Sequence, residues 1–111
     1  MEQIKWQDFE KVEIRTGTIT GVEHFAEARK PAYKLLIDFG PFGILKSSAQ
    51  ITTFYQPEGL IGKQVVAVVN FPPKQVANFI SECLVLGAVN DDGSVVLLQT
   101  ERHTTNGLRI A

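Results

Sequence analysis

The sequence has almost no cysteine: Cys83 is the only one in 111 residues, so no disulfide can form within the chain. Cys83 lies in the apolar run ECLVLG, which indicates a buried, unreactive thiol. The chain has no phosphate-binding glycine motif, and Ser47 and Ser48 lack the G-x-S-x-G turn of an exposed nucleophile. The two histidines, His24 and His103, lack a metal-ligand spacing. We therefore expect no metal, no cofactor and no enzymatic activity.

The chain also lacks an excess of charge of one sign, because its formal net charge is −1. This balance argues against long nucleic acid held non-specifically by a large positive field, but it permits a local basic patch. The longest uncharged apolar stretch, QVVAVVNFPP, is far shorter than the roughly 20 residues that a membrane helix needs. The charged start, MEQIKWQDFEK, has no apolar segment of signal-peptide type. We expect a cytoplasmic protein without membrane insertion.

Residues 1–111 are expected to form a single domain, because no linker, repeat or change of composition divides them. The stretches that we expect to be main strands are 12–22, 33–40, 44–50, 64–71 and 80–89, and 95–99 pairs back on the last of them. A bent first strand and an excursion between the third and fourth predict an all-β, five-stranded OB-fold barrel of Greek-key topology. A different small barrel or an α+β sandwich would show similar spacing.

Two strands carry more specific patterns. In 12–22 the apolar parity changes across Gly17, which predicts a β-bulge at this glycine. The run 64–71 is almost continuously β-branched, which predicts a strand buried on both faces.

The two ends of the chain lie outside the expected barrel. Trp6, Phe9 and Val12 have the spacing of one helical face, which predicts a short helix near residues 4–11. Such a helix is too short to be stable alone and must pack on something. The C-terminal extension has a turn at Asn106-Gly107 and then a last short strand.

The segment 70–87 contains a polar stretch with two prolines and two phenylalanines. A connector that only turned would need none of them, so we expect this loop to contact a partner. The lysines and phenylalanines expected around it are Lys34, Lys46, Lys74, Phe71 and Phe79. Aromatic rings beside cations are how OB-folds hold single-stranded nucleic acid. The alternative is that both phenylalanines close the barrel and the lysines are solvated.

Five stretches carry a resemblance to a known family: DFEKVEIRTGTI, IDFG, SSAQI, PEGLIGKQVVAVVNFPP and SECLVLG. Together they resemble the tRNA-binding OB domains, and among these the CsaA-like, secretion-associated chaperone-like proteins of bacteria. Domains of this family are also appended to some aminoacyl-tRNA synthetases. The resemblance implies an OB-fold with an N-terminal helix, a homodimer and no enzymatic activity. It also implies binding of tRNA, of unfolded or exported polypeptides, or of both.

The family signature after the fourth strand is an asparagine, a proline, a basic cluster, a glycine, and a serine followed three residues later by methionine. Asn70, Pro73 and Ser81 match the asparagine, proline and serine, and Lys74 starts the basic cluster. Leu84 stands where methionine is usual.

Three positions depart from this signature. Gln75 stands where a second basic residue is common, and Ile80 stands where the residue is often polar. Asn78 replaces the glycine, but asparagine tolerates the left-handed backbone region better than most residues. From residue 71 to 87 the only charges are Lys74 and Glu82, which sum to zero and offer a phosphate backbone little to bind. We therefore expect a partner of polypeptide nature, with tRNA as the alternative.

These arguments give two groups of candidate residues. The residues expected to contact a polypeptide or tRNA are Lys34, Lys46, Asn70, Phe71, Pro73, Lys74, Asn78, Phe79, Ser81 and Leu84. The residues expected at a homodimer interface are Trp6, Phe9, Leu108 and Ile110.

Overall fold

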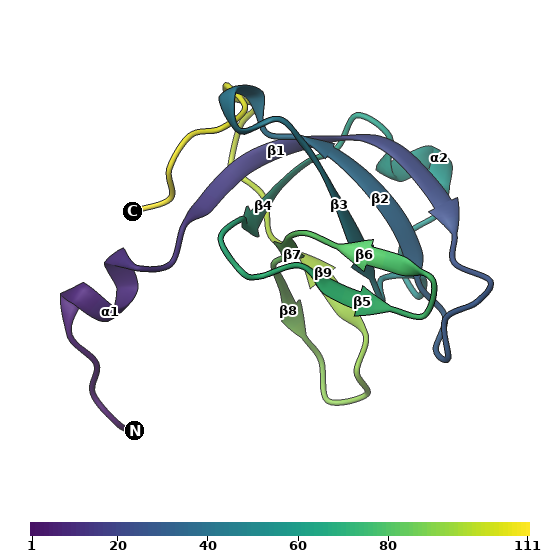
Figure 1. Cartoon of the computed structure of the whole chain (residues 1–111), viewed down its shortest axis with the longest axis horizontal. Helices are drawn as coiled ribbons and strands as arrows, with labels where there is room; N and C mark the ends of the chain where they lie inside the picture. Colours follow the sequence, from purple (N-terminus) through teal and green to yellow (C-terminus); the bar gives the residue numbers. More distant parts are fainter.

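The computed structural model describes residues 1–111 and consists mainly of β-strands (Figure 1). The elements are α1 Trp6–Glu10, β1 Ile14–His24, β2 Tyr33–Asp38, η1 Gly40–Phe42, β3 Ile44–Ala49, α2 Pro57–Leu60, β4 Gln64–Val68, β5 Lys74–Val76, β6 Phe79–Ser81, β7 Leu84–Val85, β8 Gly87–Val89 and β9 Val95–Leu97. Five strands form an antiparallel sheet in the order β3-β2-β1-β4-β7. Ser47 Oγ of β3 donates to the Cys83 carbonyl beside β7 at 3.0 Å, which helps to close the sheet into a barrel. The predicted all-β, five-stranded OB-like fold is therefore confirmed.

The barrel core is built from side chains that alternate along the strands. In β2, Leu35 and Ile37 are fully buried, and Phe39 follows them at the same parity. Gly17 of β1 faces the same core, where a Cβ would lie only 2.7 Å from side-chain atoms of Ile37 and Phe39. This close approach requires glycine. All five residues of β4 are buried, which confirms the predicted strand buried on both faces for residues 64–68. The predicted strand 64–71 is too long, because residues 70 and 71 are exposed and lie after the strand.

The predicted bulge at Gly17 is wrong. β1 pairs with β4 in continuous register across this glycine, and the irregularity lies between Ile19 and Gly21, in the pairing with β2. Thr16 is buried on the other face of β1 because the C-terminal extension covers it, and Thr16 Oγ donates to the Thr105 carbonyl at 2.8 Å. Burial on both faces of the strand produced the apparent change of parity.

The segment after β4 is a β-hairpin rather than a loop (Figure 1). β5 pairs with β6 across the two-residue turn Ala77-Asn78. The predicted single strand 80–89 is wrong, because β6, β7 and β8 divide these residues and pair with β5, β4 and β9, respectively. The break between β6 and β7 falls at Glu82, whose N–H donates to the Lys46 carbonyl of β3 at 2.7 Å.

Both α-helices are short, and α1 stands away from the barrel (Figure 1). The N-terminal helix is present as predicted, but none of its residues is buried and Trp6 is 81% exposed. The expectation that it packs on something is therefore not met within one chain. Neither helix has the length and apolar character to cross a membrane.

The C-terminal extension lies along β1 instead of standing free. The Thr16 N–H donates to the Leu108 carbonyl at 3.0 Å, and the Ile110 N–H donates to the Ile14 carbonyl at 2.9 Å. The predicted turn is present at Gly107, with a φ of 88°. The predicted last strand is reduced to a single bridge between Arg15 and Arg109.

Candidate functional site

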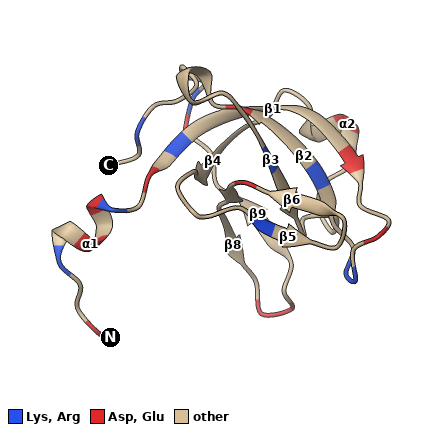
Figure 2. Cartoon of the chain, viewed as in Figure 1, with Lys and Arg blue, Asp and Glu red and all other residues tan.

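Two lysines and one phenylalanine predicted as contact residues meet beside the hairpin. Lys34 of β2 and Lys46 of β3 place their Nζ atoms 5.6 and 5.4 Å from the ring centre of Phe79 in β6. Phe25, from the β1–β2 connection, packs edge-on against Phe79 with 5.6 Å between ring centres, and Lys34 Nζ lies 4.9 Å from the Phe25 ring centre. We call these four residues the cation–aromatic cluster. Figure 2 shows the basic positions of β2 and β3 near that of β5.

The two ammonium groups of this cluster differ in their neutralisation. Lys34 pairs with Glu27 at 3.7 Å, whereas Lys46 forms no ion pair. An ammonium over an aromatic ring contributes about 0.5–1 kcal/mol at an exposed site, so these contacts help to hold the hairpin. Phe79 is half-buried. Its ring is therefore neither fully free to bind a ligand nor part of the buried core.

A groove runs between β3, β5 and the residues just after β4. Its volume is about 890 Å³, and we call it the hairpin groove. The predicted contact residues that line it are Phe71, Lys74, Ser81 and Leu84. An adjoining hollow of about 670 Å³ beside the β1–β2 connection shares four of its lining residues with the groove: Arg29, Ser48, Gln50 and Val76. The groove therefore extends along β5 toward that connection.

Two other predicted contact residues, Pro73 and Asn78, are exposed and do not line the groove. Pro73 directly precedes β5, and Asn78 lies in the turn, directly before β6. The positive φ of the hairpin turn, 52°, is at Ala77 rather than at Asn78. The tolerance of asparagine for the left-handed region is therefore not used in this turn.

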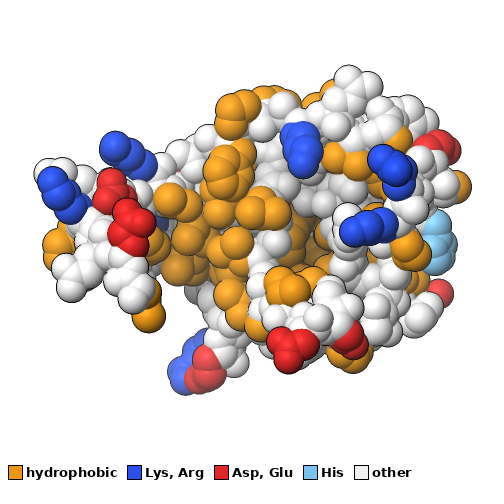
Figure 3. Space-filling view, turned by 90° about the horizontal axis from the view of Figure 1, so that it is seen from below, with side chains coloured by type: hydrophobic (Ala, Val, Ile, Leu, Met, Phe, Trp, Pro, Cys, Tyr) orange, Lys and Arg blue, Asp and Glu red, His pale blue; other side chains and the backbone are white.

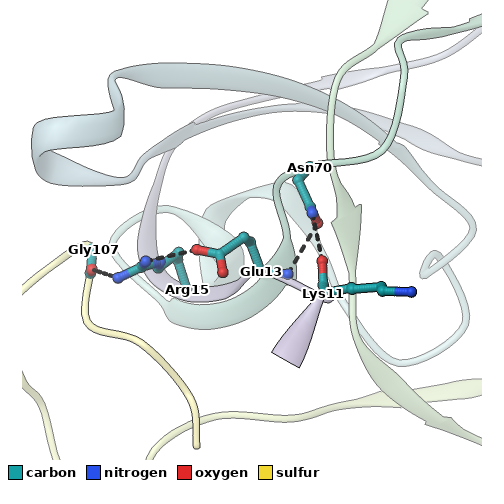
Figure 4. A network of polar contacts seen from close by, with 5 residues as sticks. All are labelled: Lys11, Glu13, Arg15, Asn70 and Gly107. Atoms are coloured by element: carbon teal, nitrogen blue, oxygen red, sulfur yellow. Dashed lines mark hydrogen bonds and ion pairs between the residues drawn. The ribbon is translucent and has the colours of Figure 1, made fainter. Parts of the chain in front are cut away.

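The Asn70 side chain bonds to backbone groups of the α1–β1 connection and does not line the groove (Figure 4). Its Oδ1 accepts the Glu13 N–H at 3.0 Å, and its Nδ2 donates to the Lys11 carbonyl at 2.7 Å. Arg15 Nη2 donates to Glu13 Oε1 at 2.7 Å, and this contact lowers the pKa of the Glu13 carboxyl. Arg15 Nη1 donates to the Gly107 carbonyl at 3.3 Å. The network joins the end of β4, the α1–β1 connection and the C-terminal extension.

The Phe25 and Arg29 side chains were missed by sequence reasoning. Both lie in the stretch HFAEARKPAYK, which reads as a loop. Its signal was the presence of several cations and aromatic residues within a few positions of one another. Only the fold brings these residues beside the hairpin, which follows much later in the chain.

The Cys83 thiol is buried at the base of the groove, and burial raises its pKa to about 12. The thiol donates a weak hydrogen bond to the Lys46 carbonyl at 3.7 Å. A thiol with this pKa stays protonated at neutral pH and is a poor nucleophile. The predicted buried thiol is confirmed.

The residues predicted at a dimer interface lie on another surface. Trp6 and Phe9 line a hollow of about 670 Å³ that also includes the C-terminal residue, Ala111. Leu108 is 46% exposed although its backbone is bound to β1. Figure 3 shows a broad apolar area near the middle of the lower face of the molecule, with basic side chains on both sides of it.

Comparisons with known proteins agree with this architecture. The model of the family described as a putative tRNA binding domain matches residues 14–109. The crystal structure of chaperone CsaA from Bacillus anthracis str. Ames is 55% identical, has a TM-score of 0.95, and is matched over 99% of this chain and 100% of that chain. The CsaA chaperone protein from Picrophilus torridus is 54% identical with a TM-score of 0.90, over 98% and 100% of the two chains.

A second group of relatives consists of much longer proteins. The methionine–tRNA ligase of Methanocaldococcus jannaschii is 31% identical over 114 residues, which cover 99% of this chain and 17% of the ligase. That of Methanococcoides burtonii is 35% identical over 104 residues, which cover 94% of this chain and 15% of the ligase. The chain thus corresponds to a small part of these ligases.

Proposed function

This chain belongs to the putative tRNA binding domain family, and from that premise we propose that it is a non-catalytic, CsaA-like binding protein for unfolded or exported polypeptides. The hairpin groove carries this proposal, because it is open to solvent and mixes apolar with polar side chains. Phe71 and Leu84 are both about half exposed there, at 54% and 49%. Exposed apolar side chains in a groove suit the side chains of a non-native polypeptide. The cytoplasm is the compartment that we propose.

The charges of the hairpin segment favour a polypeptide over a phosphate backbone, although Arg29 of the β1–β2 connection adds a second cation to the groove. Residues 71–87 carry one positive and one negative charge, Lys74 and Glu82. Nucleic-acid affinity rests largely on cations that neutralise phosphates, so this segment alone would contribute little. The 55% identity to the Bacillus anthracis chaperone, over nearly the whole of both chains, supports the same assignment.

The second candidate function is tRNA binding, and the cation–aromatic cluster favours it. Lys34 and Lys46 could bind phosphates while an aromatic ring stacks on a base. The Phe79 ring, however, already contacts two ammonium groups and the edge of Phe25. The cluster therefore suits phosphate contacts better than base stacking.

We also propose that two copies of the chain form a homodimer through the N-terminal helix and the C-terminal extension. Trp6, Phe9, Leu108 and Ile110 support this proposal because the barrel does not bury them. A two-fold axis would let each exposed end contact the partner. A dimer would also carry two hairpin grooves, and two weak sites on one polypeptide gain from effective concentration.

The test is to titrate tRNA and a chemically unfolded polypeptide separately against the purified protein, at two salt concentrations. We expect polypeptide binding that changes little with salt. Lys74→Glu, compared with Lys63→Glu, tests the groove itself, because Lys63 precedes β4 and does not line the groove, which borders the residues after this strand. If tRNA binds there, Lys74→Glu alone should lower the salt slope by about one unit, for one lost phosphate contact. Steep salt dependence with tRNA and no polypeptide binding would contradict the first proposal.

A further inference from the structure

The outer edge of β5 carries unpaired backbone groups. In the hairpin, the two-residue turn makes Val76 and Phe79 the closing pair, whose N–H and C=O groups bond across the ladder. Hydrogen-bonded and non-bonded pairs alternate along an antiparallel ladder, so the next pair, Gln75 and Ile80, turns these groups outward. The N–H and C=O of Gln75 therefore point away from β6, at an edge that no other strand covers.

The outer edge of β3 is also incomplete, but in a different way. Two of its outward N–H groups are capped by side chains: that of Lys46 donates to Glu82 Oε1 at 2.9 Å, and that of Ser48 to Ser81 Oγ at 3.1 Å. No side chain caps the next outward groups. By the same alternation, these are the Ser48 C=O and the Gln50 N–H, and neither has a hydrogen-bond partner in the chain.

Both incomplete edges border the same space. Ser48 and Gln50 line the hairpin groove on the β3 side, and Gln75 and Val76 line it on the β5 side. We propose that an extended polypeptide segment binds in the groove by strand addition, pairing with the Gln75 peptide groups and with the free groups at the end of β3. This proposal rests on the proposed polypeptide-binding function and specifies how the backbone is recognised.

The chemistry of the two edges favours a peptide backbone over other partners. Each edge presents N–H donors and C=O acceptors together, a pattern that another extended backbone matches. The phosphate groups of an RNA have only acceptors, so donors for these carbonyl groups would have to come from its 2′-hydroxyl groups and bases. Backbone pairing is also largely independent of side chains, as a binder of many unfolded sequences requires.

The flanking residues limit the length of the added strand. Pro73 has no N–H and directly precedes β5, so the ladder cannot extend in that direction. Lys74 places a charge at the start of the exposed edge, which discourages pairing between two copies of this edge. Pro73, which matches the proline of the family signature, thus defines one end of the proposed site.

The test compares two substitutions of one residue. In Gln75→Pro the outward N–H is lost, while the inward bonds of β5 to β6 are kept. In the matched control Gln75→Ala, the side chain is lost but the backbone donor remains. The probe is a synthetic peptide of alternating apolar and polar residues, and its affinity is measured by fluorescence anisotropy. We expect binding about tenfold weaker for Gln75→Pro, and a change of less than about twofold for Gln75→Ala.

A second experiment changes the peptide and keeps the wild-type protein, so its result does not depend on whether a variant folds. The same peptide with alternate backbone nitrogens methylated lacks the donors of one edge and should bind the wild-type chain about tenfold more weakly or worse. Amide hydrogen exchange at Gln75 and Gln50 should slow when the unmethylated peptide is added.

The remaining outcomes separate this inference from the proposed function. Equal binding of the methylated and unmethylated peptides would overturn strand addition and leave polypeptide binding intact. A wild-type chain that binds neither peptide would remove the proposed function and this site with it. Loss of tRNA binding in Gln75→Pro, with peptide binding unchanged, would assign the groove to RNA and overturn the inference.

Discussion

The β1–β2–β3 part of the barrel and the β5–β6 hairpin are both antiparallel, but they are stabilised differently. β2 buries Leu35 and Ile37 completely and continues to the buried Phe39. The hairpin has no fully buried residue, and is held by side-chain caps from Ser81 and Glu82 and by lysines over Phe79. Apolar burial makes the sheet a rigid frame, whereas the hairpin depends on weaker polar and cation–aromatic contacts.

This difference explains how one small domain can be stable and still expose backbone groups. The frame supplies most of the free energy of folding through its buried core. The hairpin can then keep an unpaired edge beside a groove. Regions with few buried contacts open at low free-energy cost, which suits a surface that must admit a ligand.

The largest effect should come from truncating the frame. Phe39 is fully buried, so Phe39→Ala should cost about 3–5 kcal/mol of unfolding free energy, through lost burial and a residual cavity. Chemical denaturation monitored by circular dichroism measures this change. This loss approaches the whole stability of a small domain, so we expect part of the variant to be unfolded at room temperature.

The matched variant is Phe79→Ala, which removes the same side chain from the hairpin. We expect a loss of only about 1–2 kcal/mol in stability, because this ring is half-buried and is held by two lysines and the edge of Phe25. Polypeptide affinity should fall, because the hairpin that borders the groove is less well held. A stability loss equal to that of Phe39→Ala would place Phe79 in the core and erase the contrast between the two regions.

A second effect, of intermediate size, concerns the exposed α1 helix. If Trp6 lies at the centre of a dimer interface, Trp6→Ala should weaken dimerisation by about 2 kcal/mol, or roughly thirtyfold. Sedimentation equilibrium at micromolar concentration measures this shift toward the 12.3 kDa monomer. The control is Phe54→Ala, because Phe54 is also exposed, at 56%, but lies between β3 and α2. A wild-type chain that sediments as a monomer would remove the dimer proposal.

The frame could be predicted from the sequence because its patterns are local. Alternation in 33–40 located the core face of β2, and the β-branched run 64–71 identified a strand buried on both sides. The bulge was misplaced because burial of Thr16 depends on the C-terminal extension, which is distant in sequence. A single strand has no local signal for what covers its outer face.

The candidate site could be predicted only in part, for the same reason. Lys34, Lys46 and Phe79 do meet, but Phe25 completes their cluster from a stretch that reads as a loop. Asn70 was read as a ligand residue, yet its amide holds the α1–β1 connection. The groove depends on unpaired backbone groups, which are invisible in a sequence until the strand pairing is known.

The smallest expected effect tests whether the hairpin turn carries backbone strain that the frame does not. Ala77 has a φ of 52°, a region that a residue with a Cβ adopts only at a cost of about 1–2 kcal/mol. Glycine has no such cost, so Ala77→Gly should relieve the strain and lose part of the gain through greater freedom in the unfolded chain. The net result should be a stabilisation of about 0.5–1 kcal/mol. Thermal unfolding should show it, together with slower amide exchange across the hairpin.

The neighbouring residue of the same turn provides the control, because Asn78 does not have a positive φ. Asn78→Gly relieves no strain and only increases the freedom of the unfolded chain, so it should destabilise by up to about 1 kcal/mol. Opposite signs for the two adjacent substitutions would locate the strain at Ala77 and show that the turn holds an unfavourable conformation to keep β5 beside the groove. Destabilisation by both would instead mean that Ala77 is unstrained and that the register of the hairpin is set by its contacts with β3 alone.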